Sequence, residues 1–224
     1  MSSTPVRSPG GGSSKRRESF SPIILPESPV ASMKQKGNLT GNARILRDNC
    51  ASICNLSKKW DVHNQAGADI VMKIINLKLE AQEQSTGSSE EVQYPVGLEE
   101  LIIELEKTCA NMATIVDEME KSKGHLLGVE KLEKFQNKGD TPIFVSWPTA
   151  KFGQFADYVA SVYRKELKVK VKVKEKIAHQ STRENLMFYF SCWFYQVYID
   201  KDIKKSCITW QWKLVSDDEN ASDM

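Results

Sequence analysis

A run of residues spaced alternately three and four positions apart constrains this chain more than any other feature of its sequence. Seven of the ten positions are apolar, and the run comprises Leu46, Asn49, Ile53, Leu56, Trp60, His63, Gly67, Ile70, Ile74 and Leu77. Such spacing places side chains along one stripe of an α-helix. It predicts one helix of about 40 residues, roughly 60 Å long, or two stacked helices broken near Gly67.

Three positions of this stripe, Asn49, His63 and Gly67, lack the bulk that a self-sufficient coiled coil prefers. We therefore expect the stripe to be completed by the third helix of the same chain and by a partner subunit. A homodimer through this stripe is not expected, and hetero-oligomers are favoured over homo-oligomers.

A second helix is predicted from about Leu98 into the 120s, because the same alternation continues there. A glycine pair, Gly124 and Gly128, weakens the pattern before 139–142 ends it. The apolar positions of this helix are Leu98, Ile102, Leu105, Cys109, Met112, Val116 and Met119.

A third helix is predicted after Trp147-Pro148, with Thr149 as its N-cap. Between Lys168 and Lys174 lysine and valine alternate, a pattern that alone is typical of a strand. The helical stripe on both sides favours a helix instead. A fourth, shorter helix follows an N-cap at 181 or 182 and carries apolar residues to 197.

These elements predict an all-α protein, an elongated antiparallel bundle or coiled coil of about four helices. Residues 1–37 are rich in Ser, Pro, Gly and basic residues, a composition typical of disorder. The bundle occupies 38–200, with loops at 84–97 and 136–146. Residues 201–224 form a C-terminal segment with an acidic tail, in which Ile208, Trp210 and Trp212 form either a short strand or a docking segment.

The basic tail contains several candidate phosphorylation sites, although a Ser/Pro-rich segment also produces such pairs by chance. Four are followed by proline, and Ser19 stands in the basic motif Arg16-Arg17-Glu18-Ser19; the candidates are Thr4, Ser8, Ser21, Ser28 and Ser19. A phosphate adds nearly two negative charges.

Charge is segregated between the second and third helices. Residues 90–120 contain nine acidic residues against Lys107 alone, whereas 149–179 contain eight basic residues against three acidic ones. Opposite signs indicate that the two helices are neighbours, or that each meets its own partner surface. Because single exposed pairs stabilise little, this pattern concerns register and partner choice.

No residue pattern points to catalysis, a cofactor or a metal, so we predict a protein without enzyme activity. The three histidines have no metal-ligand spacing, and five irregularly spaced cysteines indicate reduced thiols. Cys50 and Cys54 lie on one helix face, where small apolar packing is favoured over a shared metal. The longest nearly apolar run, 186–199, is too short to span a bilayer, and no signal peptide is evident at the start.

The basic stretch from Arg164 to Lys176 offers an alternative function, because its lysines could hold the phosphates of nucleic acid. Against this, alternation with valine spreads the charge around a helix, and aromatic residues for stacking are absent within the stretch. A solvated face, or a face for an acidic partner, is favoured.

The sequence resembles the family of cyclin-dependent kinase 2-interacting proteins. Over 43–80 the matching residues are Ala43-Arg44-Ile45-Leu46-Arg47-Asp48-Asn49, Lys59-Trp60-Asp61, Asn64-Gln65-Ala66-Gly67 and Asn76-Leu77-Lys78. Over 144–198 they are Trp147-Pro148-Thr149, Phe152, Tyr163-Arg164-Lys165-Glu166-Leu167, Lys174-Glu175, Ile177-Ala178-His179 and Trp193. Beyond Tyr198 the resemblance ends.

The resemblance implies a non-catalytic nuclear adaptor, also present in the cytoplasm. Family members link cyclin-dependent kinase 2 with the cell-division-cycle 7 kinase at replication origins and support checkpoint signalling through the ATR-interacting protein. They also belong to an AAA ATPase complex, beside another small helical subunit, that acts in large-ribosomal-subunit maturation and replisome protein turnover. The partner-binding candidates are Trp60, Trp147, Pro148, Phe152, Tyr163, Arg164, Lys165 and Trp193; for Trp147 and Tyr163 a purely structural role is the alternative.

Overall fold

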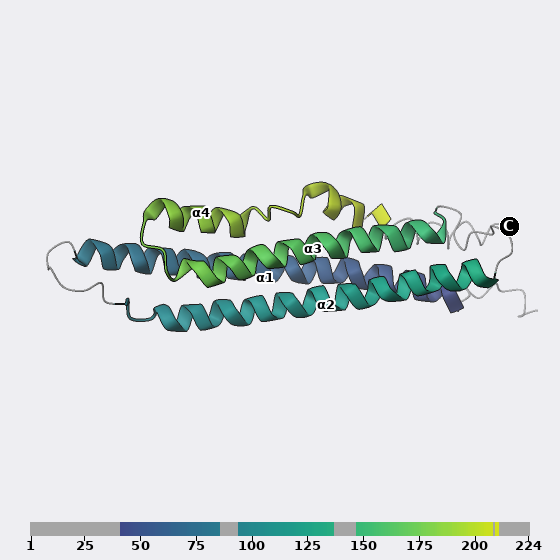
Figure 1. The fold of residues 1–224 in the computed structure, drawn as a ribbon, viewed down its shortest axis with the longest axis horizontal. Helices are drawn as coiled ribbons and strands as arrows, with labels where there is room; N and C mark the ends of the chain where they lie inside the picture. The colour runs from purple at the N-terminus through teal and green to yellow at the C-terminus, as the bar shows by residue number, and fades with distance from the viewer. Residues whose placement is uncertain (1–40, 86–93, 137–146, 208, 211–224) are drawn as a thin grey trace, which may run out of the picture. The chain divides into compact units, whose positions relative to one another are not determined.

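The computed structural model describes residues 41–85, 94–136, 147–207 and 209–210, whose regular secondary structure is entirely helical. The labelled helices are α1 (Gly41–Ser85), α2 (Leu98–Gln136), α3 (Thr149–Ile177) and α4 (Arg183–Phe194), and 201–207 and 209–210 are also helical. Helices α1, α2 and α3 lie side by side and alternate in direction (Figure 1). The predicted all-α class is confirmed, whereas the predicted tail over 1–37 lies outside the described residues.

Helix α1 continues without a break through Gly67 for 45 residues. A Cβ atom at this position would lie 2.6 Å from Cε2 of Trp193 and closer still to Cζ2. Gly67 therefore makes room for the indole of Trp193, although a glycine inside a helix costs about 1 kcal/mol relative to alanine. The gap in the apolar stripe is filled by α4, not by the third helix as the sequence suggested.

Helices α2 and α3 also continue where the sequence left their course open. Helix α2 passes Gly124 and Gly128, which only weaken the pattern, and ends at Gln136, where the predicted loop begins. The alternating Lys-Val stretch is helical, as predicted, because α3 spans Thr149–Ile177. Thr149 is not the N-cap: that position is Pro148, without a side-chain cap. The Thr149 hydroxyl instead donates to Oε2 of Glu133 in α2, at 2.6 Å.

The acidic α2 and the basic α3 are neighbours, which is one of the two arrangements that their opposite charges indicated. Arg164 Nη2 lies 3.0 Å from Oε1 of Glu120, and Lys174 Nζ lies 3.2 Å from Oε1 of Glu106. These partly exposed pairs fix the register of the two helices more than they stabilise them.

Helix α4 packs against α1 and α3, and the residues that follow it continue along the bundle (Figure 1). Trp210 is buried and stacks on Phe152, with ring centroids 6.0 Å apart, while its ring meets that of Phe155 edge-on at 4.9 Å. The strand alternative is therefore wrong for Trp210, whose buried stripe has helical spacing; Ile208 and Trp212 lie outside the described side chains. The stripe comprises Ile199, Ile203, Cys207 and Trp210.

Candidate protein-interaction surface

The fourth element of the bundle is interrupted between α4 and the helical residues 201–207. At the interruption Gln196 has a φ of 49°, a left-handed conformation that residues other than glycine adopt uncommonly. Such a backbone costs on the order of 1–3 kcal/mol and persists only where the surroundings hold it.

Three polar side chains from α1 and α3 hold this interruption in place. Trp60 Nε1 donates to Oε1 of Gln196 at 2.9 Å. The backbone N–H of Tyr198 donates to Oε2 of Glu166 at 2.8 Å, and Lys170 Nζ donates to the carbonyl oxygen of Trp193. The chain therefore leaves its helical path where the interior supplies polar partners for the freed groups.

Glu166 and Lys170 form an ion pair in the interior, four positions apart on α3. Both side chains are fully buried, and Lys170 Nζ lies 3.0 Å from Oε1 of Glu166. The contact is an ion pair rather than a well-aligned hydrogen bond. Lys170 Nζ also lies 5.1 Å from the ring centroid of Trp193. Burial lowers the pKa of Lys170, and the neighbouring Glu166 carboxylate opposes that shift.

Helix α4 and the segment that follows it expose a set of large apolar side chains, which we call the aromatic face. Tyr195 is 75% exposed and Phe188 61%. Aromatic residues and methionine are enriched where proteins bind one another, and exposed apolar patches mark interaction sites. The aromatic face comprises Met187, Phe188, Phe194, Tyr195, Val197 and Tyr198.

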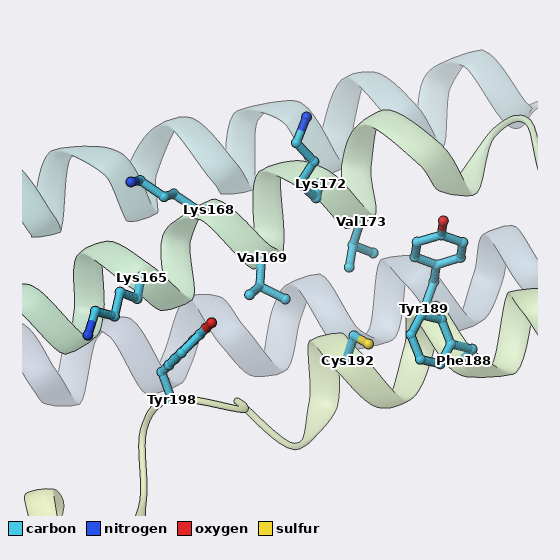
Figure 2. Close-up of a pocket in the computed structure, with 9 residues that line it drawn as sticks. All are labelled: Lys165, Lys168, Val169, Lys172, Val173, Phe188, Tyr189, Cys192 and Tyr198. Carbon is cyan, nitrogen blue, oxygen red and sulfur yellow. The ribbon is translucent and has the colours of Figure 1, made fainter.

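A groove of about 570 Å³ lies between α3 and α4, next to the aromatic face. Figure 2 shows Val169 and Val173 on the side of α3 that faces α4 and Tyr198, with lysines along the same stretch of α3. Its lining contains three lysines and no acidic residue, and comprises Lys165, Lys168, Lys172, Val169, Val173, Phe188, Tyr189, Cys192 and Tyr198.

Four of the eight partner-binding candidates lie in the core, fully buried: Trp60, Phe152, Tyr163 and Trp193. The rings of Trp60 and Tyr163 meet edge-on at 5.2 Å, and the Tyr163 hydroxyl lies 2.6 Å from Oγ of Ser57. Burial raises the pKa of Tyr163. Trp193 Nε1 donates to the carbonyl oxygen of Asn64 at 2.9 Å. All four side chains make their contacts inside the bundle.

The other four candidates reach the surface in different ways. Trp147 is half-buried against Phe152, at 5.7 Å between centroids, and the exposed Pro148 precedes α3. Arg164 is exposed but faces Glu120 of α2, whereas Lys165 lines the groove. The five phosphorylation candidates lie outside the described residues.

The basic stretch from Arg164 to Lys176 divides into parts with different surroundings. Lys170 is buried, and Arg164 and Lys174 pair with α2. Three lysines, spaced three and four positions apart, line the groove instead: Lys165, Lys168 and Lys172. The charge is therefore focused on one face to a greater degree than the lysine-valine alternation suggested.

The cysteines are unpaired thiols, four of them buried and Cys192 partly exposed. Burial raises the pKa of Cys109 to about 11, and Cys54 Sγ donates to the carbonyl oxygen of Cys207 at 3.0 Å. Across 41–85, 94–136, 147–207 and 209–210, no three His, Cys, Asp or Glu residues gather as metal ligands. In the same ranges no helix combines the length and apolar character that a membrane crossing requires.

The fold and this surface define a class: an all-α bundle that exposes aromatic side chains beside a groove lined with lysines. No family model matches the chain. It is 35% identical over 199 residues to the cyclin-dependent kinase 2-interacting protein of Xenopus laevis, covering 84% of this chain and 92% of that protein. The proteins of that name from Mus musculus and Homo sapiens are 31% and 30% identical, covering 81% and 80% of this chain and 90% and 88% of their own lengths. The chain belongs to the cyclin-dependent kinase 2-interacting protein family, and the resemblance found in the sequence is confirmed.

Proposed function

We propose that this chain is a non-catalytic adaptor that binds a cyclin-dependent kinase through its aromatic face. The names of its relatives say that those proteins interact with cyclin-dependent kinase 2. The observation that carries the proposal is the interruption after α4. There, buried polar contacts hold the strained Gln196 and the backbone of Tyr198, beside aromatic side chains that are exposed. Strain maintained in this way is typical of functional positions.

The non-catalytic part of the proposal is supported by how the interior uses its ionisable groups. Glu166 and Lys170 pair with each other and with the backbone around α4. The Tyr163 hydroxyl contacts Ser57. These groups support the architecture of the bundle and the position of the aromatic face.

We extend the proposal to the assemblies that the family resemblance implies. The chain would act in the nucleus, link a cyclin-dependent kinase with the cell-division-cycle 7 kinase and join checkpoint signalling through the ATR-interacting protein. It would also be a subunit of an AAA ATPase complex, beside a small helical co-subunit, in ribosome maturation and replisome proteostasis. The hetero-oligomeric role agrees with an aromatic face that the described residues leave uncovered.

Affinity purification of the full chain with quantitative mass spectrometry tests this proposal. We expect recovery of a cyclin-dependent kinase or an AAA ATPase, and a decrease of at least tenfold for the double variant Tyr195→Ala, Tyr198→Ala. Tyr158→Ala is the matched control, because Tyr158 is 51% exposed but lies on α3 outside the aromatic face. Recovery of neither class of protein by the unaltered chain would contradict the proposal.

One observation favours nucleic-acid binding as a second candidate. The groove brings Lys165, Lys168 and Lys172 beside the rings of Phe188, Tyr189 and Tyr198, and such a combination of cations and rings binds single strands. Binding of an oligonucleotide, titrated against salt, tests it: the affinity must fall steeply with increasing salt. Absence of salt-sensitive binding near physiological ionic strength would exclude this candidate.

A further inference from the structure

We propose that the groove between α3 and α4 is the docking site for an acidic amphipathic helix of a partner protein. This inference rests on the proposed function, because it names the kind of protein segment that the adaptor recognises. The groove, its charge and its apolar floor each restrict that segment.

Charge is the first restriction. Lys165, Lys168 and Lys172 are spaced three and four positions apart on α3, so they follow one side of the helix over roughly 10 Å. Among the described residues Lys165 and Lys168 have no ion-pair partner, and no carboxylate lines the groove. The side chains of a partner helix repeat at the same spacing, so its carboxylates at positions i, i+3 and i+7 match the three ammonium groups.

Lys172 has a competing partner on its own helix, since its Nζ lies 2.7 Å from Oε2 of Glu175. The two side chains are 69% and 42% exposed, so water and salt screen their attraction. A carboxylate brought by a partner can replace Glu175 without uncovering a buried charge.

The floor of the groove is the second restriction. Val169 and Val173 point from α3 toward α4, where Cys192 lines the groove beside the rings of Phe188 and Tyr198. An amphipathic helix fills a groove of this kind with the apolar side chains of one stripe, while its charged residues lie on either side. The partner segment therefore presents leucine, isoleucine or phenylalanine toward this floor and carboxylates toward the lysines.

A nucleic-acid strand fits these surroundings less well than an acidic helix. The acidic α2 lies along the other side of α3, where Glu106 and Glu120 face Lys174 and Arg164. A phosphate backbone that extended from the groove toward α2 would be repelled by these carboxylates, whereas a helix confined to the groove would not. The valine floor offers no polar partner to sugar or phosphate oxygens.

The wall of the groove is held in its binding shape before a partner arrives. Tyr198, which lines the groove, donates its backbone N–H to the buried Glu166, and the neighbouring Gln196 accepts from Trp60. Rigidity of this kind lowers the entropy lost on binding. Glu166 is thus a positioning residue: it fixes Tyr198 and touches no partner.

Selection from a randomised library of helical peptides on the immobilised full chain tests the proposal. We expect enriched sequences to combine an apolar stripe with Asp or Glu at i, i+3 or i+4, and i+7. The most enriched peptide then serves as the probe in fluorescence anisotropy, where its affinity must fall as salt increases. Enrichment of basic sequences, or no charge preference among the selected peptides, would overturn the proposal.

Charge reversal locates the site. The double variant Lys165→Glu, Lys168→Glu must weaken the peptide at least tenfold, while Lys121→Glu, Lys131→Glu on the exposed surface of α2 must leave it within twofold. Circular dichroism confirms that both variants keep their helices. Equal affinities of the two variants would overturn the assignment. So would tighter binding of a single-stranded oligonucleotide at the same lysines, or self-association of the chain through them.

The outcome separates this inference from the proposed function. If the groove variant still recovers the kinase or ATPase at the unaltered level, the adaptor function stands and the groove is not its docking site. If the peptide binds the groove but neither protein class is recovered, the docking chemistry stands and the proposed partners are wrong.

Discussion

The three long helices and the interrupted fourth element bury their residues in different ways. Helix α3 buries twelve of its 29 residues along one stripe, whereas α4 buries only Leu186 and Trp193 among twelve residues. The long helices therefore gain most of their stability from apolar packing. The fourth element attaches through a few large contacts and leaves its aromatic side chains exposed.

Polar contacts in the interior are distributed just as unevenly. The buried pair of Glu166 and Lys170 and the strained Gln196 all lie at the interruption after α4. Burying an ion pair stabilises a fold less than apolar packing of equal volume does, so these groups specify where the chain bends. The comparison shows that the three long helices supply most of the stability. The fourth element contributes less, because it contains a strained residue and leaves aromatic side chains exposed.

The largest expected effect comes from unbalancing the buried pair. Lys170→Met leaves the Glu166 carboxylate buried without a cation, and we expect a loss of about 3–5 kcal/mol in the free energy of unfolding. Combining it with Glu166→Leu removes both charges and should recover at least half of that loss. Urea denaturation measures both values. A double variant no more stable than Lys170→Met would show that the unpaired Glu166 carboxylate is not the cause of the loss.

Two glycines of the long helices should respond in opposite directions to the same substitution. Gly67→Ala forces the new methyl group into the indole of Trp193, and we expect a net loss of about 1–3 kcal/mol. Gly124→Ala is the matched control, because no atom lies within 4 Å of its new methyl group; it should gain about 0.5–1 kcal/mol. Thermal unfolding compares them. Stabilisation of both variants would mean that Trp193 does not occupy the space beside Gly67 of α1.

A smaller effect is expected where the regular part of the bundle contains a buried hydroxyl. Tyr163→Phe keeps the ring against Trp60 but leaves Ser57 without its 2.6 Å contact. We expect a loss of about 1 kcal/mol, measured by urea denaturation. Tyr158→Phe, at an exposed position, should change the stability by less than roughly 0.5 kcal/mol. Equal responses of the two tyrosines would contradict the buried contact.

The smallest effect on stability is expected on the aromatic face. Tyr195 is 75% exposed, so Tyr195→Ala should change the free energy of unfolding by no more than roughly 0.5 kcal/mol. The same variant should lower the recovery of protein partners in affinity purification. A loss of stability above 2 kcal/mol, on the order of a buried aromatic truncation, would place Tyr195 in the core instead.

The helices themselves could be predicted from the sequence because their apolar stripes are long and regular. The stripe from Leu46 to Leu77 lies within α1, which extends a few residues beyond it at each end. The lysine-valine stretch was assigned correctly to a helix because the helical stripe continues on both sides of it. Local signals were less informative at the boundaries. The hydroxyl of Thr149 bonds to Glu133, sixteen positions away in the sequence, and a local capping pattern contains no such information.

The interruption after α4 could not be predicted, for a physical reason. No glycine or proline marks it, and the side chain of the left-handed Gln196 bonds to Trp60, which comes from a distant helix. Glu166 is buried in α3, although acidic residues are seldom fully buried. Its burial depends on Lys170 and on the N–H of Tyr198.

The partner-binding candidates show the same limit at the level of the site. Matching residues in a family include those that maintain its fold, and Trp60, Tyr163 and Trp193 prove to be buried core residues. The aromatic face was missed because the apolar residues up to 197 were assigned to one stripe of the predicted fourth helix. The high density of rings between Phe188 and Tyr198 was the available signal, since one helix face cannot bury them all.

The attachment of Trp193 to α1 also has a consequence for the order in which the chain folds. Its bond to Asn64 joins positions 129 apart, and the contact of Cys54 with Cys207 joins positions 153 apart. By contrast, α1, α2 and α3 meet as successive antiparallel neighbours. Closing a long loop costs more entropy than closing a short one. We therefore expect the α1–α2 and α2–α3 hairpins to form first during synthesis. Until α4 packs against them, the space beside Gly67 and the charges of Glu166 and Lys170 remain exposed to water. The contact between Trp193 and α1 closes only after the segment that contains α4 has been synthesised.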